Sequence, residues 1–468
     1  MKKYRWLLFI LLLLLPAAAF GETLFVSPGN GTLTEALAVC GDGDVIELGN
    51  GVYSEEAESF PLTVSRKIVL RAAEGANPVI DAPAMKAAIR VEADGAVLEG
   101  LEIRFRRTGI YNIANDLTLL KCSLVLADEN LRVSSCGMWC GGIYRLTMRD
   151  CAFTGCSVAF AGPPLSGRSA SLPKLTGLFE VGEDAGFFTT HTIENCTVNE
   201  KPLFYAADQR EVVPPDGAGE IICCGCDEVV IRNADVSDAS IGIVLAYNRH
   251  VTVEDSRADR CGVFGIYVAK CDSGDITRCS AEGTNHGIDI RADRNITLRD
   301  CTALHCEQGL FFSAVQDSHM IDCTVRDTRQ GYFMAAGSGN GMTGCTSSGC
   351  ENGIHLETEG ETQITACTVE KCTVCGIRAD RTHLVMTQCT LRNNWVAAMV
   401  YCGKETTIRE NVFEANENCS LYLRDAGAAC IAGNRFSGSG EYSVLLIGTE
   451  QDSFQPDNET DKPPTQKQ

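Results

Sequence analysis

Apolar and polar residues alternate in short runs along the second half of the chain, and these runs return at a fixed spacing. In one run Ile296 and Leu298 alternate with polar residues up to Cys301, a pattern typical of a strand with one buried face. The small residue that follows the run returns every 22 residues, with one step of 23. This column contains Ala234, Ser256, Cys279, Cys301, Cys323, Cys345, Cys367, Cys389, Asn411 and Gly433. A strand-rich repeat of this length predicts a solenoid.

Two further columns belong to the same repeat. A second small or polar column contains Cys261, Cys306, Cys350, Cys372, Asn394 and Asn416. A glycine column contains Gly242, Gly265, Gly287, Gly309, Gly331, Gly353 and Gly376. Stacked coils lie about 4.8 Å apart, so corners accept only small or locally hydrogen-bonding side chains, and glycine suits positive φ or close backbone approach. We therefore predict an all-β fold, a right-handed parallel β-helix of 22 residues per coil.

The spacing and composition divide the chain into five regions. The start is basic, then apolar, then rich in small residues, as in a secretory signal peptide. A short helix over Thr34–Val39 is expected to cover the first coil, which would otherwise expose its core and strand edge. The predicted regions are the signal peptide (1–21), the cap and first coils (22–121), coils with inserted loops (122–233), regular coils (234–450) and a disordered polar tail (451–468).

The formal net charge is −21, which gives no support to binding of nucleic acid or of an anionic membrane. With the signal peptide, this charge predicts a secreted protein at the extracellular surface or in the periplasm. We expect no membrane insertion once the signal is cleaved. The sequence leaves the oligomeric state open.

The 25 cysteines would ordinarily predict disulfides in an exported protein. In stacked columns, however, parallel Cβ vectors hold the thiols further apart than a relaxed disulfide needs, which favours reduced thiols in the core. Cys223, Cys224 and Cys226 form a tight cluster that could bind Cu(I). The register points Cys223 inward, Cys224 outward and Cys226 into a turn, so the three thiols diverge. We therefore expect no metal or cofactor. Copper bound at these thiols is the weaker alternative.

Two segments resemble known proteins. Residues 22–105, with Gly43-Asp-Val-Ile46, Gly51-Val-Tyr53 and the run from Ala93 to Ile103, resemble the opening of pectin-lyase-like β-helix proteins. Residues 190–205, followed by Gly217-Ala-Gly-Glu-Ile-Ile222, resemble NosD-type β-helix proteins, with Glu200 and many cysteines as departures. The resemblance implies an exported β-helix, and the NosD label implies a role beside copper enzymes of denitrification. Lyases, hydrolases, epimerases and adhesins share the fold, so the resemblance transfers no reaction.

Two columns are expected to point outward, at two and four residues after each glycine. They mix aromatic with charged side chains, a surface that suits a polysaccharide because sugar faces stack on rings while hydroxyls bond to charged groups. The alternative is that a loop covers Phe311 and Phe333. The predicted carbohydrate-binding residues are Tyr267, Asp289, Arg291, Phe311, Phe333, His355, Arg378, Tyr422 and Arg424. The same two columns are expected to continue through Val400 and Cys402.

Glu357 and Asp380 fall on adjacent coils of one outward column. Their spacing could approach the separation of about 5–5.5 Å between the carboxyl groups of retaining glycosidases, so they are the candidate catalytic pair. The favoured function is carbohydrate binding or adhesion without catalysis. The alternatives are a polysaccharide hydrolase or lyase, and a copper-handling accessory protein.

Overall fold

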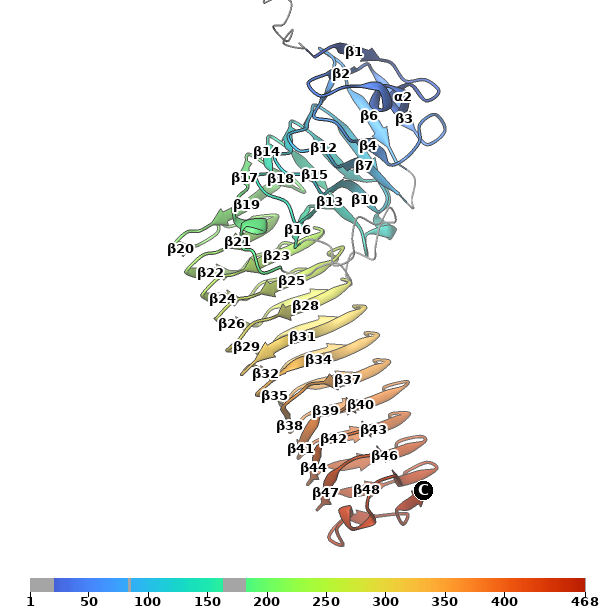
Figure 1. Cartoon of the computed structure of the whole chain (residues 1–468). Helices are drawn as coiled ribbons and strands as arrows, with labels where there is room; N and C mark the ends of the chain where they lie inside the picture. The colour runs from blue at the N-terminus through green and yellow to red at the C-terminus, as the bar shows by residue number, and fades with distance from the viewer. Residues whose placement is uncertain (1–20, 83–85, 163–181, 468) are drawn as a thin grey trace, which may run out of the picture.

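The computed structural model describes residues 21–82, 86–162 and 182–467 (Figure 1). It is a right-handed parallel β-helix with about 22 residues per coil, which confirms the predicted fold. The signal-peptide prediction and the Pro163-Pro164 part of the predicted inserts lie outside the described residues. Within the described ranges, no helix has the length and apolar character needed to cross a membrane.

The coils form two stacks that meet near β16 and β21 (Figure 1). Sheets A, B and C build the N-terminal stack. Sheet A contains β1 (Thr23–Val26), β2 (Val45–Leu48), β5 (Val69–Ala72), β8 (Val97–Glu99), β11 (Thr118–Leu120), β14 (Thr147–Arg149) and β17 (Thr192–Glu194). Sheet B contains β3 (Gly51–Ser54), β6 (Pro78–Asp81), β9 (Glu102–Phe105), β12 (Ser123–Leu126), β15 (Ala152–Thr154) and β18 (Thr197–Val198). Sheet C contains β4 (Leu62–Val64), β7 (Ala87–Val91), β10 (Thr108–Asn112), β13 (Cys136–Gly141) and β16 (Val158–Ala161).

Sheets D, E and F build the C-terminal stack. Sheet D contains β19 (Lys201–Ala207), β21 (Glu220–Cys224), β23 (Ile241–Ala246), β25 (Phe264–Ala269), β28 (His286–Arg291), β31 (Gln308–Gln316), β34 (Gln330–Ser338), β37 (Asn352–Glu357), β40 (Cys375–Asp380), β43 (Val396–Tyr401), β46 (Cys419–Arg424), β49 (Tyr442–Ile447) and β51 (Thr465–Lys467). Sheet E contains β20 (Glu211–Val212), β22 (Glu228–Arg232), β24 (His250–Glu254), β26 (Ser273–Thr277), β29 (Ile296–Arg299), β32 (His319–Ile321), β35 (Asn340–Thr343), β38 (Glu361–Thr365), β41 (His383–Thr387), β44 (Glu405–Arg409) and β47 (Ala428–Ala432). Sheet F contains β27 (Ser280–Glu282), β30 (Thr302–Leu304), β33 (Thr324–Arg326), β36 (Thr346–Ser348), β39 (Thr368–Glu370), β42 (Thr390–Arg392), β45 (Val412–Glu414), β48 (Arg435–Ser437) and β50 (Glu459–Thr460).

The glycine column of sheet D is explained by close backbone approach. A Cβ on Gly287 would lie 2.6 Å from the carbonyl oxygen of Gly309, and a Cβ on Gly309 would lie 2.5 Å from that of Gly331. Neither glycine has a positive φ. Of the two reasons the sequence offered for this column, the structure supports the close approach of neighbouring coils.

The cysteine column lies at a corner between sheets E and F and is buried throughout. Cys323 Sγ lies 3.6 Å from Leu298 O of the preceding coil, so the thiols contact backbone carbonyls. Further along, Asn411 replaces the thiol: its Nδ2 donates to Met386 O (3.0 Å) and its Oδ1 accepts from Cys389 N (2.8 Å). The next member is Asn434, whose Oδ1 accepts from Asn411 N (3.0 Å). The assignment of Gly433 to this column was therefore wrong by one residue, because this coil is one residue longer.

A helix covers the N-terminal coil, as predicted. Helix α2 (Thr32–Val39) begins two residues earlier than expected and buries Leu33 and Leu37 against the first coils. Its first turn is held by Glu58, whose carboxylate accepts from Leu33 N (2.9 Å) and Thr34 N (2.8 Å). This carboxylate satisfies donors that the helix cannot pair internally.

The predicted disorder of the tail is contradicted over the described residues. After the short 3₁₀ helix η3 (Gln451–Ser453), β50 pairs with β48 and β51 pairs with β49. Asn458 extends the asparagine column, since its Oδ1 accepts from Asn434 N (2.9 Å) and its Nδ2 donates to Ile431 O (2.7 Å). The polar tail is ordered because it supplies hydrogen bonds to the last coil, whose edge would otherwise be open.

Candidate functional site

The two outward columns of sheet D are in the predicted register. Phe311 pairs with Phe333, Phe333 with His355, and His355 with Arg378. Beyond Arg378 the register departs from prediction, because Arg378 pairs with Met399 and Asp380 with Tyr401. Met399 and Tyr401 therefore take the places assigned to Val400 and Cys402. This coil is one residue shorter and has Ala397 where earlier coils have glycine, which is the signal that sequence reasoning missed.

The first part of these columns is closed. Tyr267 and Asp289 were predicted to face a glycan, yet both are fully buried. Asp289 Oδ2 lies 2.7 Å from His286 Nδ1, and Arg291 Nε donates to Asp289 Oδ1 (2.7 Å). The guanidinium of Arg291 lies over Tyr267, 5.8 Å from the ring centroid. The assignment of Tyr267 and Asp289 to an open binding face is therefore wrong, because their neighbours exclude solvent from them.

The described end of the insert packs beside the closed part of the columns. Gly182 O accepts a hydrogen bond from Tyr247 Oη, and Glu183 pairs with Lys270 (2.8 Å). Phe188, in the short helix α3 (Gly186–Thr189), is buried 5.8 Å from the Tyr247 ring. Residues from the N-terminal side thus pack against the ends of β23 and β25.

The second part of the columns is open. Phe311 and Phe333 are half-buried and stack at 4.9 Å with an interplanar angle of 21°. His355 continues this row edge-on, 5.0 Å from Phe333. Arg291 covers one end, 5.3 Å from the Phe311 centroid. The structure thus contains a partly exposed aromatic platform on β31 and β34 that leads to the imidazole on β37.

A polar cluster adjoins the platform. His355 Nε2 lies 3.1 Å from Glu357 Oε1 and 3.3 Å from Asp380 Oδ2, and Arg378 Nε donates to Asp380 Oδ2 (2.8 Å). The Asp380 and His355 side chains are 15% and 14% exposed, whereas Glu357 is 43% exposed. The structure therefore brings together both predicted catalytic carboxylates and two of the predicted carbohydrate-binding residues.

A pocket of about 390 Å³ opens beside this cluster. It is lined by Glu357, Thr358, Glu359, Asp380, Arg381 and Lys404. Lys404 Nζ donates to Glu359 O (3.1 Å) and so closes one side of the pocket. Lys404 and Glu359 were missed by sequence reasoning because they lie in turns outside the outward columns.

Further along, Tyr401 and Tyr422 are half-buried with ring centroids 5.5 Å apart, and Arg424 is exposed. Arg378 lies over Tyr401, 5.6 Å from the centroid. Of the nine residues predicted to bind carbohydrate, Phe311, Phe333, His355, Arg378, Tyr422 and Arg424 lie on this open part. Arg291 lies at its border. We call the outward surface of β31, β34, β37, β40, β43 and β46 the open face.

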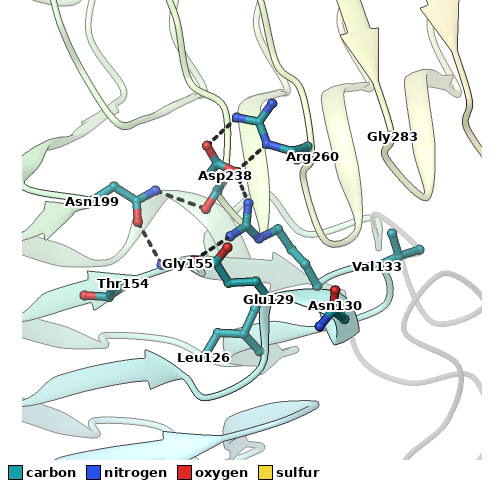
Figure 2. Close-up of a pocket in the computed structure, with 11 residues that line it drawn as sticks. Leu126, Glu129, Asn130, Val133, Thr154, Gly155, Asn199, Asp238, Arg260 and Gly283 are labelled. Atoms are coloured by element: carbon teal, nitrogen blue, oxygen red, sulfur yellow. Dashed lines mark hydrogen bonds and ion pairs between the residues drawn. The ribbon is translucent and has the colours of Figure 1, made fainter.

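A larger pocket, of about 550 Å³, lies at the meeting of the two stacks (Figure 2). Asp238 is held there by Arg260, whose Nη2 lies 2.6 Å from Asp238 Oδ2, and by Arg132. Asn199 Nδ2 donates to Asp238 O (3.0 Å) and its Oδ1 accepts from Gly155 N (2.8 Å). These contacts cross from the loop after β12 and from sheet B to the C-terminal stack, so they tie the two stacks together.

A buried polar network reinforces the same junction. Ser157 Oγ donates to Glu220 Oε1 (2.7 Å) and accepts from Ser240 N (2.9 Å). Burial raises the pKa of the Glu220 carboxyl well above its ordinary value. The carboxyl is therefore expected to be neutral and to serve the junction as a hydrogen-bonding group.

The alternative copper site consists of three neighbouring cysteines. Cys223, Cys224 and Cys226 are buried, and burial raises the pKa of all three thiols. A soft Cu(I) site needs converging thiolates. In the described parts of the chain, one group of at least three His, Cys, Asp or Glu residues has converging donor atoms. It consists of His355, Glu357 and Asp380 and contains no sulfur. These three cysteines therefore do not fit a Cu(I) site.

Two models of known protein families match parts of the chain. A family model for a right-handed beta helix region matches residues 219–360. A model described as periplasmic copper-binding protein (NosD) matches residues 305–455. Each model matches less than half of the chain, and both matches agree with the right-handed parallel β-helix described above. Over residues 305–455 the chain is similar to the NosD family, as the resemblance of residues 190–222 also suggested. No curated protein matches it significantly.

Solved structures match most of the chain at low identity. The periplasmic alginate epimerase AlgG has 10% identity and a TM-score of 0.37, over 89% of this chain and 84% of that chain. The mannuronan C-5 epimerase AlgE6 A-module of Azotobacter vinelandii has 12% identity and a TM-score of 0.34, over 92% and 94%. Pectate lyase Pel9A has 12% identity and a TM-score of 0.21, over 94% and 80%. At these values the similarity assigns no activity.

Proposed function

We propose that the open face binds a polysaccharide and that the protein acts as a carbohydrate-binding β-helix. The observation that carries the proposal is the stacked, partly exposed pair Phe311 and Phe333, which continues into His355 and then into charged groups. Such rings offer apolar faces to sugars, and the neighbouring carboxylates and guanidinium groups offer hydrogen bonds to hydroxyls. An elongated ligand fits this arrangement because the columns continue over six successive strands of sheet D.

The proposed location is outside the cytoplasm, in the periplasm or at the cell surface. The support is the periplasmic description of the matching family model, together with the signal-like first residues. Fractionation of cells that express the full chain, with mass determination of the mature N-terminus, tests the location. Full-length protein retained in the cytoplasm would contradict it.

Glycan arrays with neutral and acidic polysaccharides test the binding proposal, followed by titration calorimetry on any glycan retained. Phe333→Ala should weaken binding without changing the thermal unfolding midpoint. The matched control is Phe25→Ala, because Phe25 is 64% exposed on β1, at the far end of the N-terminal stack. Equal loss of binding in both variants, or no binding by the wild-type protein, would contradict the proposal.

The second candidate is a polysaccharide-active enzyme that uses Glu357 and Asp380. The observation in its favour is that donor oxygens of these two carboxylates lie within 4.8 Å of each other and of His355 Nε2. Against it, Asp380 is already engaged by His355 and Arg378. Reducing-sugar and unsaturated-product assays test turnover. If turnover is found, Glu357→Gln and Asp380→Asn must abolish it while binding is kept, since amides keep the shape but not the acid–base or nucleophilic chemistry.

A further inference from the structure

We propose that His355, Glu357 and Asp380 form a binding site for a divalent transition-metal ion such as Zn²⁺. This inference goes beyond polysaccharide binding, because it concerns the protein with the ion alone. His355 Nε2 faces both carboxylates, and all three donor atoms lie within 4.8 Å of one another.

Two of the three donor separations match those expected around a bound metal ion. With metal–ligand bonds of about 2.0–2.1 Å, two ligands of a tetrahedral ion lie about 3.3 Å apart. His355 Nε2 lies 3.1 Å from Glu357 Oε1 and 3.3 Å from Asp380 Oδ2. An ion would sit between Nε2 and the two oxygens at nearly their present separations, so little rearrangement is required.

Rigid elements hold the three ligands. His355 and Glu357 lie two residues apart on β37 and therefore on the same face, while Asp380 lies on β40 of the next coil. Phe333 packs against the His355 ring at 5.0 Å. Arg378 Nε donates to Asp380 Oδ2 (2.8 Å), an outer contact of the kind that orients a ligating carboxylate.

The chemistry of the donors selects the class of ion. One imidazole nitrogen and two carboxylate oxygens suit divalent ions such as Zn²⁺ or Cu²⁺, whereas Cu(I) prefers sulfur. Glu357 is 43% exposed, and the pocket of about 390 Å³ adjoins it, so a coordination position remains open on that side. Three protein ligands with one open position is the arrangement of zinc sites that bind water or a further ligand.

The chain provides a matched control. His383 also lies between two carboxylates, but its Nε2 is 3.7 Å from Glu361 Oε2 and 3.5 Å from Glu405 Oε2, and this trio does not converge. Both histidines lie on strands of the C-terminal stack. Loss of binding in a His355 variant but not in a His383 variant therefore reports on geometry and not on histidine content.

Accessible thiols must be removed before the test. All the cysteines are buried except Cys402, which is exposed, and Cys430, which is half-buried. Experiments in a Cys402→Ser, Cys430→Ser background, after chelator treatment and dialysis, confine the measurement to nitrogen and oxygen donors. Calorimetric titration with Zn²⁺, and separately with Cu²⁺, should show one equivalent bound.

His355→Gln, Glu357→Gln and Asp380→Asn should each weaken binding by at least ten-fold, while His383→Gln should bind as the parent does. Glu357→Gln is decisive because its exposed side chain can change without disturbing the fold. A Co²⁺-loaded sample should show no thiolate charge-transfer band. Absence of binding, unchanged affinity in Glu357→Gln, or a thiolate band would overturn the inference. Glycan binding is measured separately, so failure of the metal site leaves the polysaccharide proposal standing, and the reverse also holds.

Discussion

Sheet D contains two segments that look alike in sequence and differ in what they can bind. From β21 to β28 the outward column includes Val244, Tyr267 and Asp289, all without solvent exposure. From β31 to β46 the same column includes Phe311, Phe333, His355 and Arg378, all at least partly exposed. The repeat fixes the direction of each side chain, but the side chains packed around it decide whether solvent reaches it.

Each segment holds a histidine, an aspartate and an arginine in contact. In the closed segment, His286, Asp289 and Arg291 form a set around a carboxylate that is 0% exposed. In the open segment, His355, Asp380 and Arg378 are joined by Glu357, which is 43% exposed. Buried ion pairs are costly to break, whereas exposed ones remain available to a ligand. We therefore expect the first set to stabilise the fold and the second to act on ligands.

Asp289→Ala should be among the most destabilising substitutions in the closed segment. It would remove the carboxylate that serves both His286 and Arg291, and breaking a buried pair in this way costs about 3–5 kcal/mol. Chemical denaturation measures the change, with Asp380→Ala as the counterpart in the open segment. If Asp380→Ala destabilised the protein as much, the contrast between structural and ligand-facing sets would fail.

Acid should weaken the stabilising contacts that Asp289 makes with His286 and Arg291 in the closed segment. Burial alone would raise the pKa of Asp289, but Arg291 and His286 outweigh it and hold this pKa below the ordinary value of 3.8. The unfolded chain then binds the proton more tightly than the folded one. The stabilisation is complete above pH 3.8 and is lost as the pH falls below it, by at most about 1.4 kcal/mol per pH unit. Unfolding free energies measured against pH should show a smaller acid loss in Asp289→Asn.

Substitutions of Cys323 test whether this side chain points into the core of the same coils. Cys323→Leu should cost about 1–3 kcal/mol, because the corner is fully buried and overfilling it displaces its neighbours. Cys323→Asn should be milder, since asparagine at this corner can pair as Asn411 does with Met386 O and Cys389 N. Thermal and chemical denaturation of both variants provide the measurement. Equal tolerance of leucine and asparagine would contradict the inward assignment.

The sequence was sufficient to predict the fold, the coil length, the α2 cap and most of the register, because these follow from alternation and from small residues at corners. It was also sufficient to place Glu357 and Asp380 on neighbouring coils. It could not show that Tyr267 and Asp289 are buried, because alternation gives only the direction of a side chain, whereas burial depends on how neighbours such as His286 and Arg291 pack around it. It also missed the convergence of His355 Nε2 on both carboxylates, which depends on side-chain rotamers.

Two aromatic substitutions on one column give the sharpest version of the comparison. Tyr267→Ala should destabilise the protein by about 3–5 kcal/mol, because a fully buried ring is removed. Phe333→Ala should leave unfolding nearly unchanged and weaken polysaccharide binding several-fold, consistent with about 1 kcal/mol for an aromatic contact. Thermal unfolding and calorimetry on the same preparations measure both quantities. Tyr267→Ala, in the closed segment, should therefore lower stability, and Phe333→Ala, in the open segment, should lower affinity for the polysaccharide. If Phe333→Ala instead lowered stability as much as Tyr267→Ala, the platform would have to be packed beneath a covering segment, and the open face would not be a binding surface.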